Sequence, residues 1–134
     1  MKRQKQSQED YLRTLYILWE KDKNIHSKKI ADYLNISKPS VSAMLNKLQQ
    51  KKYINKKPYG TVNLTKKGLV KAKEITRRHR LIEVFLKKSL GLKNENIHQE
   101  AHHLEHAFSD LSIKKLEKIL KNPKKCPHGK KIPK

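Results

Sequence analysis

The residues with the clearest chemical potential are histidines and acids in the last third of the chain. His98, His102, Glu105 and His106 follow one another at intervals of four, three and one positions. At about 100° per residue of an α-helix, these four side chains share one sector, and apolar side chains fill the neighbouring sector. Imidazole and carboxylate groups beside a core are ligands for divalent transition metals. The pattern predicts a metal site; the alternative is a histidine-rich, solvated helix face.

A second pair of possible ligands, His79 and Glu83, lies four residues apart in the amphipathic stretch that precedes this cluster. Ile82 and Leu86 share the same helical face, so the pair borders an apolar core, where a polar group needs a partner. A second metal site would account for the pair. The alternative is that the two side chains simply hydrogen-bond to each other at the edge of the core.

Residues ahead of these clusters carry the pattern of a helix-turn-helix. Ser27 begins a short helix, the turn at 35–37 is three residues long, and apolar residues at helical spacing continue over about 38–48. Pro39 fits the first turn of the later helix, where its missing N–H removes no helical hydrogen bond. An earlier helix is expected to begin with Ser7 as its N-cap.

A hairpin and three more helices are expected after the helix-turn-helix. Residues 53–56 and 61–64 are β-prone and flank a Lys-Pro-Tyr-Gly turn, which predicts a hairpin in the position of a wing. Further helices are expected over about 65–90, 94–108 and 112–120.

The expected fold class is therefore mainly α. An N-terminal winged helix-turn-helix DNA-binding domain (1–66) is joined by a long helix to an α-helical metal-binding and dimerisation domain (67–134). With 35% hydrophobic residues and a mean hydropathy of −0.92, the cores are small and a homodimer is expected to add buried surface. Its expected contacts are Leu81, Phe85, Leu104 and Phe108.

The charge of the chain favours a polyanionic partner. Lys and Arg number 33 against 12 Asp and Glu, for a formal charge of +21, and double-stranded DNA is the expected partner. A general lysine bias in composition is the alternative. The later helix of a helix-turn-helix enters the major groove, so the base-facing candidates are Ser37, Lys38, Pro39, Ser40 and Ala43. Phosphate contacts are expected from Lys28, Lys29, Lys38, Lys47, Lys56 and Lys57.

The single cysteine, Cys126, excludes an intramolecular disulfide framework. Cys126 lies in a Cys-Pro-His-Gly segment that offers at most two ligands, and we expect it to be dispensable for metal binding. No signal peptide and no run of 18 apolar residues is recognised, so we expect a cytoplasmic protein without a membrane partner.

Ordered motifs along nearly the whole chain resemble the diphtheria toxin repressor and manganese transport regulator family of metalloregulators. The motifs are Glu9-Asp10-Tyr11-Leu12-Arg13-Thr14-Leu15-Tyr16, Ser37-x-Pro39-Ser40-Val41-Ser42, Leu64-Thr65-x-x-Gly68, Arg78-His79-Arg80-Leu81-x-Glu83, Glu100-Ala101-x-x-x-Glu105-His106 and Cys126-Pro127-His128-Gly129. The resemblance implies a short form of the family without the C-terminal SH3-like domain of longer members.

The resemblance also implies how the ligands are grouped. One site would consist of Asp10, His102, Glu105 and His106, and the other of His79, Glu83 and His98. Asp10 by itself is only an acid favourable to a helix N-terminus. In the family, metal orders the first helix against the dimerisation domain and fits the paired winged helices to a palindromic operator. The implied function is a metal-dependent repressor of manganese or iron uptake genes.

The expected cofactor is Mn(II) or Fe(II), with Co(II) or Zn(II) as possible substitutes. The iron-type branch has methionine where Asp10 stands and cysteine where His102 stands. The manganese-type branch has carboxylates at both positions and at that of Arg13. The chain resembles neither branch fully: Asp10 favours a harder ion than a thioether would, but His102 and Arg13 are not carboxylates.

Two other functions compete with this interpretation. A His/Glu metal site could activate water in a hydrolase, but no separate general base, phosphate loop or nucleophile accompanies the ligands. We therefore expect no enzyme and no small organic substrate. The remaining alternative is a winged-helix DNA-binding protein without metal control.

Overall fold

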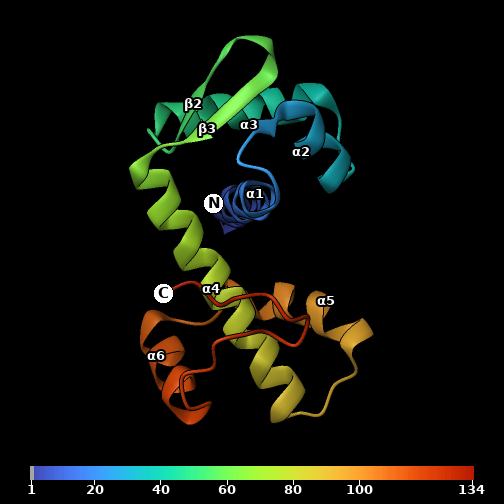
Figure 1. Ribbon diagram of the computed structural model, residues 1–134, viewed down its shortest axis with the longest axis vertical. Coiled ribbons are helices and arrows are strands. Elements are labelled where there is room, and N and C mark those ends of the chain that lie inside the picture. Colours follow the sequence, from blue (N-terminus) through green and yellow to red (C-terminus); the bar gives the residue numbers. More distant parts are fainter. Residues whose placement is uncertain (1) are drawn as a thin grey trace. The chain divides into compact units, whose positions relative to one another are not determined.

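The computed structural model describes residues 2–134, with side chains from residue 7 onward. The fold class is mainly α with one small antiparallel sheet, as predicted (Figure 1). The described chain forms two compact units, which meet at Ile75 and Thr76 inside the long helix α4. The elements in order are α1 (Lys2–Lys21), β1 (Ile25–His26), α2 (Ser27–Leu34), α3 (Lys38–Gln50), β2 (Ile54–Lys56), η1 (Pro58–Gly60), β3 (Thr61–Leu64), α4 (Lys66–Lys88), α5 (Asn94–Glu105) and α6 (Asp110–Ile119). The proposed domain boundary at 66/67 stays a prediction.

The helix-turn-helix of the first unit consists of α2 and α3. Asn35 ends α2 with a left-handed backbone (φ 54°), and the Ser37 hydroxyl caps α3 by accepting from the backbone N–H of Ser40 at 3.3 Å. Pro39 lies in the first turn of α3, as predicted. The expected N-cap at Ser7 is wrong: α1 already begins at Lys2, because the Lys, Arg and Gln residues before Ser7 are good helix formers and contain no breaker.

The wing of the first unit is a three-stranded sheet in the order β1-β3-β2, with both pairs antiparallel. The hairpin of β2 and β3 is as predicted, whereas the two-residue strand β1, with Ile25 opposite Val62, was not expected. Helices α1 to α3 and the sheet share one core, in which Leu15, Ile30 and Leu48 are fully buried. This core fixes the wing and α3 in one unit.

The start of α4 is tied to the wing by a close backbone contact. The Thr65 hydroxyl donates to the carbonyl of Lys52 at 2.7 Å and accepts from the N–H of Gly68 at 3.0 Å. A Cβ on Gly68 would lie only 1.8 Å from the carbonyl oxygen of Tyr53. Only glycine allows the helix to approach the chain this closely.

The second unit packs the end of α4 against α5, α6 and the C-terminal segment. Its core contains the fully buried Leu81, Ile82 and Ile97. The predicted dimer contact at Leu81 is therefore wrong, because that side chain is fully buried in the core of its own unit. The C-terminal segment is held to α4 by Arg80, whose guanidinium donates to the carbonyl of Lys131 at 2.6 Å.

Two helices of the second unit end or begin earlier than expected. The α5 helix stops at Glu105, three residues before the expected end, and His106 is its C-cap. The α6 helix begins at Asp110, because Ser109 caps it by accepting from the N–H of Ser112.

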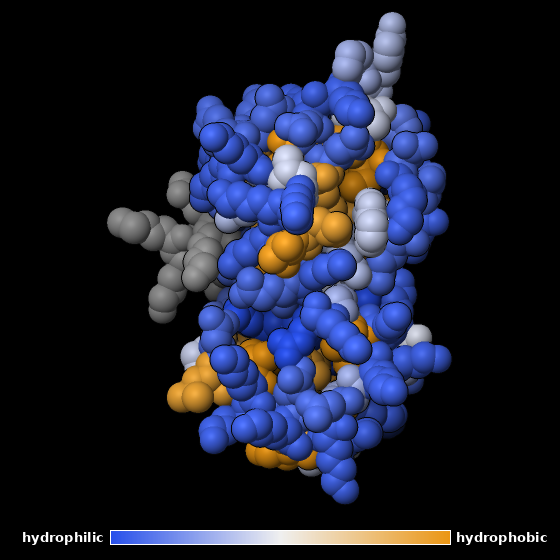
Figure 2. All heavy atoms as spheres, turned by 60° about the vertical axis from the view of Figure 1, so that its left-hand side comes forward, coloured by the Kyte–Doolittle hydropathy of each residue, from blue (hydrophilic) through white to orange (hydrophobic). Residues whose placement is uncertain are grey.

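Exposed apolar side chains remain on the second unit. Leu90, Leu111 and Ile119 are 56%, 68% and 73% exposed, and the expected dimer contacts Phe85, Leu104 and Phe108 are only partly buried. On the face shown in Figure 2, hydrophobic residues form separate patches within a mostly hydrophilic surface. Among the described residues, no helix has both the length and the apolar character that crossing a membrane requires.

Candidate metal centres and nucleic-acid interface

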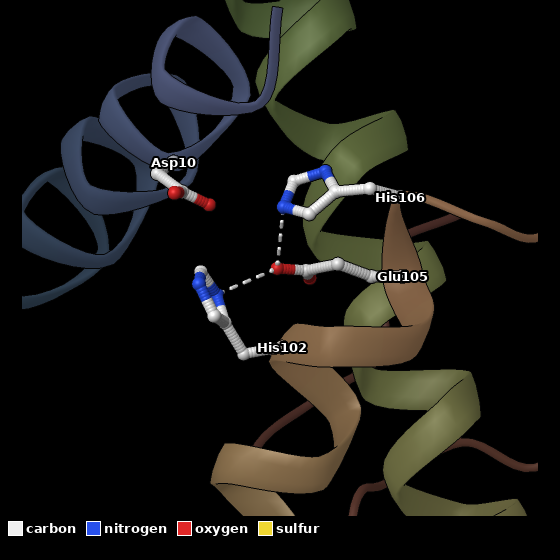
Figure 3. A group of neighbouring side chains, drawn as sticks. All are labelled: Asp10, His102, Glu105 and His106. Atoms are coloured by element: carbon white, nitrogen blue, oxygen red, sulfur yellow. Dashed lines mark ion pairs between the residues drawn. The ribbon is translucent and has the colours of Figure 1, made fainter. Parts of the chain in front are cut away.

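The end of α5 presents three of the predicted metal ligands together (Figure 3). Glu105 is the centre of this group and is 2% exposed. Its Oε1 lies 3.2 Å from Nδ1 of His102 and 3.5 Å from Nε2 of His106. Because the helix ends at Glu105, His106 lies on the cap and its ring turns toward the same oxygen. Two imidazoles and a carboxylate are thereby arranged as ligands on one side of a divalent cation.

His79 connects this group to the second one. Its Nδ1 lies 2.7 Å from Oε2 of Glu105, and its Nε2 lies 3.3 Å from Nδ1 of His98 and 3.5 Å from Oε2 of Glu83. The predicted association of His79, Glu83 and His98 is therefore present in the second unit. A histidine that binds a metal through one nitrogen commonly donates its other N–H to a carboxylate, and Glu105 is positioned to accept from His79.

The surroundings of Glu83 fit a cation. Oε2 of Glu83 is buried and has no hydrogen-bond partner among the described residues, although nitrogens of His79, His98 and His128 lie 3.2–3.7 Å away. Imidazole nitrogens gathered around a buried carboxylate oxygen form a donor set that suits a divalent metal. Burial raises the pKa of the Glu83 carboxyl, but the polar contacts and charges of these histidines outweigh burial and lower the pKa to about 2. The carboxylate is thus ionised and ready to coordinate.

Two donors near Glu83 were not among the predicted ligands. Cys126 and His128 each offer an atom that lies, with a Glu83 oxygen, inside a group no wider than 4.8 Å. Cys126 is buried, and its backbone N–H donates to the carbonyl of Lys130 at 2.8 Å, which folds the segment back toward α4. The signal in the sequence is the Cys-x-His spacing, which by itself supplies only two ligands.

Asp10, the remaining predicted ligand, belongs to α1 of the first unit, where its backbone carbonyl accepts from the Thr14 hydroxyl at 2.8 Å. Its predicted association with the ligands of the second unit stays a prediction.

The predicted DNA-contacting residues are all exposed. This holds for Ser37, Lys38, Pro39, Ser40, Ala43, Lys28, Lys29, Lys47, Lys56 and Lys57. The Ser37 hydroxyl, however, is already engaged in capping α3 and in a 2.9 Å hydrogen bond with the Ser40 hydroxyl, and Lys29 pairs with Asp22 at 3.2 Å. To donate to DNA, the Ser37 hydroxyl would have to give up its hydrogen bond with the Ser40 hydroxyl.

A hollow of about 360 Å³ lies between the helix-turn-helix and the wing. Its floor is apolar, formed by Val41, Leu45 and Val62, and four of the predicted phosphate-binding lysines surround it. They are Lys28, Lys38, Lys56 and Lys57. Cationic groups from α2, α3 and the wing thus converge on one face of the first unit, as an anionic backbone requires.

Comparison with known proteins agrees with this architecture. Residues 5–62 match the N-terminal DNA binding domain of iron dependent repressors, and residues 65–134 match the metal binding and dimerisation domain of the same proteins. The fold and the ligand clusters define the class: metal-dependent transcriptional regulators. The chain belongs to the iron-dependent repressor family.

Individual relatives extend the comparison. An HTH-type transcriptional regulator of Methanocaldococcus jannaschii is 39% identical over 113 residues, which cover 84% of this chain and 90% of that protein. The iron-dependent repressor IdeR of Mycobacterium tuberculosis is 35% identical over 125 residues, 93% of this chain and 54% of IdeR. A structure of the manganese regulator SloR superposes with a TM-score of 0.84 at 44% identity, covering 95% of this chain and 59% of SloR. The chain thus spans little more than half of IdeR and SloR.

Proposed function

We propose that this chain is a non-enzymatic, metal-dependent repressor whose divalent metal promotes binding to a palindromic operator in DNA. The observation that carries the proposal is the pair of buried carboxylates, Glu83 and Glu105, each surrounded by imidazoles inside the second unit. A buried carboxylate is costly unless a cation compensates it. In the metal-free protein the neighbouring histidines compensate Glu83, and a bound metal would take over that charge compensation while binding the same histidines.

The metal that regulates DNA binding is assigned to the Glu105 group. His102, Glu105 and His106 supply three ligands from the second unit, and we assign Asp10 of the first unit as a further ligand, on the basis of the family motif around it. A metal held by both units stabilises one arrangement of the DNA-binding unit on the dimerisation domain, so its binding energy favours the operator-bound state. His79, Glu83 and His98 form the second site, which Cys126 and His128 extend.

The DNA is held by the first unit in the geometry of a winged helix. The start of α3 enters the major groove with Ser37, Lys38, Pro39, Ser40 and Ala43, and the surrounding lysines hold phosphates. A homodimer presents two such units, which matches a palindromic site. Its contacts come from the second unit, where the candidate interface residues are the exposed Leu90, Leu111 and Ile119 and the partly buried Phe85, Leu104 and Phe108.

Mn(II) or Fe(II) is the proposed physiological metal, and manganese or iron uptake genes are the proposed targets. The donors of the Glu105 group are imidazole and carboxylate, which suit Mn(II), Fe(II), Co(II) and Zn(II). The name of IdeR specifies iron and that of SloR manganese, which places both metals among the first to test.

The deciding experiment is fluorescence anisotropy of a labelled DNA fragment from the chain's own upstream region, titrated with protein under reducing conditions. Mn(II), Fe(II), Co(II) and Zn(II) are added separately, and a chelator serves as reference. We expect metal to strengthen binding by about 5- to 150-fold, the usual range of a coupling energy. Binding unaffected by chelator would instead support a winged-helix protein without metal control.

Two variants assign the effect to its site. His106→Ala and Glu105→Ala should abolish the metal response while the far-ultraviolet circular dichroism is retained. The matched control is His103→Ala, because His103 lies on the same helix but is exposed and outside both ligand groups. A metal response that survives in the first two variants would place the regulatory metal elsewhere.

A further inference from the structure

Tyr59 at the tip of the wing is 98% exposed, the largest exposed fraction among the large hydrophobic side chains that the structure describes. It lies in η1 between β2 and β3, and its ring therefore contributes nothing to the core of the first unit. An aromatic ring left wholly in water contributes little to folding, so packing within the unit does not explain a tyrosine here.

The backbone of Tyr59 adds a second observation. Its φ of 67° and ψ of 26° lie in the left-handed region, which glycine and asparagine adopt more easily than a bulky residue. The tip is nevertheless fixed: Pro58 precedes it, Gly60 follows with a φ of 77°, and the N–H of Lys57 donates to the carbonyl of Thr61 at 2.8 Å. A strained residue held by its neighbours with its side chain in solvent is typical of a functional position.

The charges around the tip identify the chemistry of a partner. Lys56 and Lys57 precede Tyr59 in the wing, and both line the hollow that also contains Lys28 and Lys38. Gly60, the next residue, lies at the same hollow and approaches the Ser27 hydroxyl so closely that a Cβ there would lie 3.0 Å from it. Tyr59 thus projects from the rim of a cationic surface that suits a polyphosphate backbone.

We propose that Tyr59 is a DNA-positioning residue: its hydroxyl donates to a backbone phosphate beside the major-groove segment that α3 enters, and its ring lies against the adjoining deoxyribose. Tyrosine hydroxyls are among the groups that fix a protein's register on the duplex through phosphate contacts. The inference rests on the proposed function, because it needs the first unit to bind DNA through α3 and the wing. The left-handed tip leaves the Tyr59 phenol exposed to solvent in the absence of DNA.

The test compares wild type, Tyr59→Phe and Tyr59→Gly by anisotropy at fixed salt, with saturating metal, on operator DNA and on a scrambled duplex. Tyr59→Phe removes only the hydroxyl and should weaken binding by about two- to tenfold, the value of one hydrogen bond. The loss should be equal on both duplexes, because a phosphate contact carries no sequence information. Tyr59→Gly should weaken binding further.

Melting temperature and metal affinity without DNA separate this role from a structural one. Tyr59→Gly relieves the left-handed strain, so its melting temperature should equal or exceed that of wild type while DNA binding falls. Variants that bind both duplexes like wild type would overturn the proposal and leave the repressor function intact. A loss of affinity confined to operator DNA would overturn it too, since that result would mean that Tyr59 contacts bases rather than phosphates. A wild type that binds neither duplex would refute both proposals.

Discussion

Nδ1 of His128 lies 3.2 Å from Oε2 of Glu83, so the C-terminal segment and the long helix α4 contribute to one group of donors. The contact brings Cys126, two residues earlier, to the same place. A thiolate favours softer ions, whereas the carboxylate and imidazoles also suit Mn(II). A metal bound by this group would therefore meet donors whose composition distinguishes metals.

The first prediction concerns Cys126. Cys126→Ser should lower Zn(II) and Co(II) affinity by more than the roughly 10- to 100-fold that the loss of an outer-shell partner costs, because a direct ligand is removed, and should change Mn(II) affinity less. Competition titration with a chromophoric chelator measures the affinities. In the Co(II)-loaded protein, the near-ultraviolet thiolate absorption should disappear. If Cys126→Ser binds each of the three metals with the affinity of wild type, Cys126 is dispensable, as expected from the sequence.

The second prediction is a pH dependence of the metal-free protein. The pKa of Glu83 is lowered from 4.5 to about 2, so the ionised carboxylate stabilises the fold fully above pH 4.5. That stabilisation is lost as the pH falls toward 2, and at about 1.4 kcal/mol per pKa unit it amounts to about 3 kcal/mol. Urea unfolding of wild type and Glu83→Gln, with chelator present, should show a difference that shrinks below pH 4.5. A difference independent of pH would contradict the assignment.

The third prediction tests Asp10 as the ligand from the first unit. If it binds the metal, operator DNA should raise metal affinity by the same factor as metal raises DNA affinity. Asp10→Asn should then retain metal binding through His102, Glu105 and His106 but lose this coupling. Isothermal titration with metal, in the presence and absence of operator, gives both quantities. If Asp10→Asn keeps the full coupling between metal binding and operator binding, Asp10 is not a metal ligand.

The fourth prediction concerns the dimer. Leu111→Asp or Ile119→Asp should shift the association equilibrium toward monomer, because a charge would be buried at the interface; the cost of several kcal/mol exceeds the loss of one apolar contact. Sedimentation velocity at tens of micromolar measures the shift. Val70→Asp is the matched control, since Val70 is 62% exposed but lies in the first unit. A Val70 variant that dissociates equally would place the interface elsewhere.

Periodicity in the sequence was sufficient for the elements whose apolar residues repeat, namely the helix-turn-helix and the long helix, and β-propensity with a turn signal was sufficient for the hairpin. It was also sufficient to place His79 beside Glu83 and His102 beside Glu105, because residues four and three apart share a helical face. The strand β1 was missed because two residues carry no period, and its pairing with β3 depends on contacts distant in the sequence.

The errors have physical reasons as well. Leu81 has the same type and spacing as a dimer contact, and only the packing of the second unit reveals that it is fully buried. The association of Glu83 with His128 depends on a chain reversal fixed by backbone hydrogen bonds of the C-terminal segment, such as that from Ile132 to Lys124. Such long-range backbone contacts leave no periodic pattern.

The contact between Gly68 and the carbonyl of Tyr53 has a mechanical consequence. With no side chain between them and with Thr65 bonded across the junction, the first turn of α4 cannot slide or roll against the wing without breaking backbone packing. The first turn of α4 and the wing must therefore move as one body within the first unit.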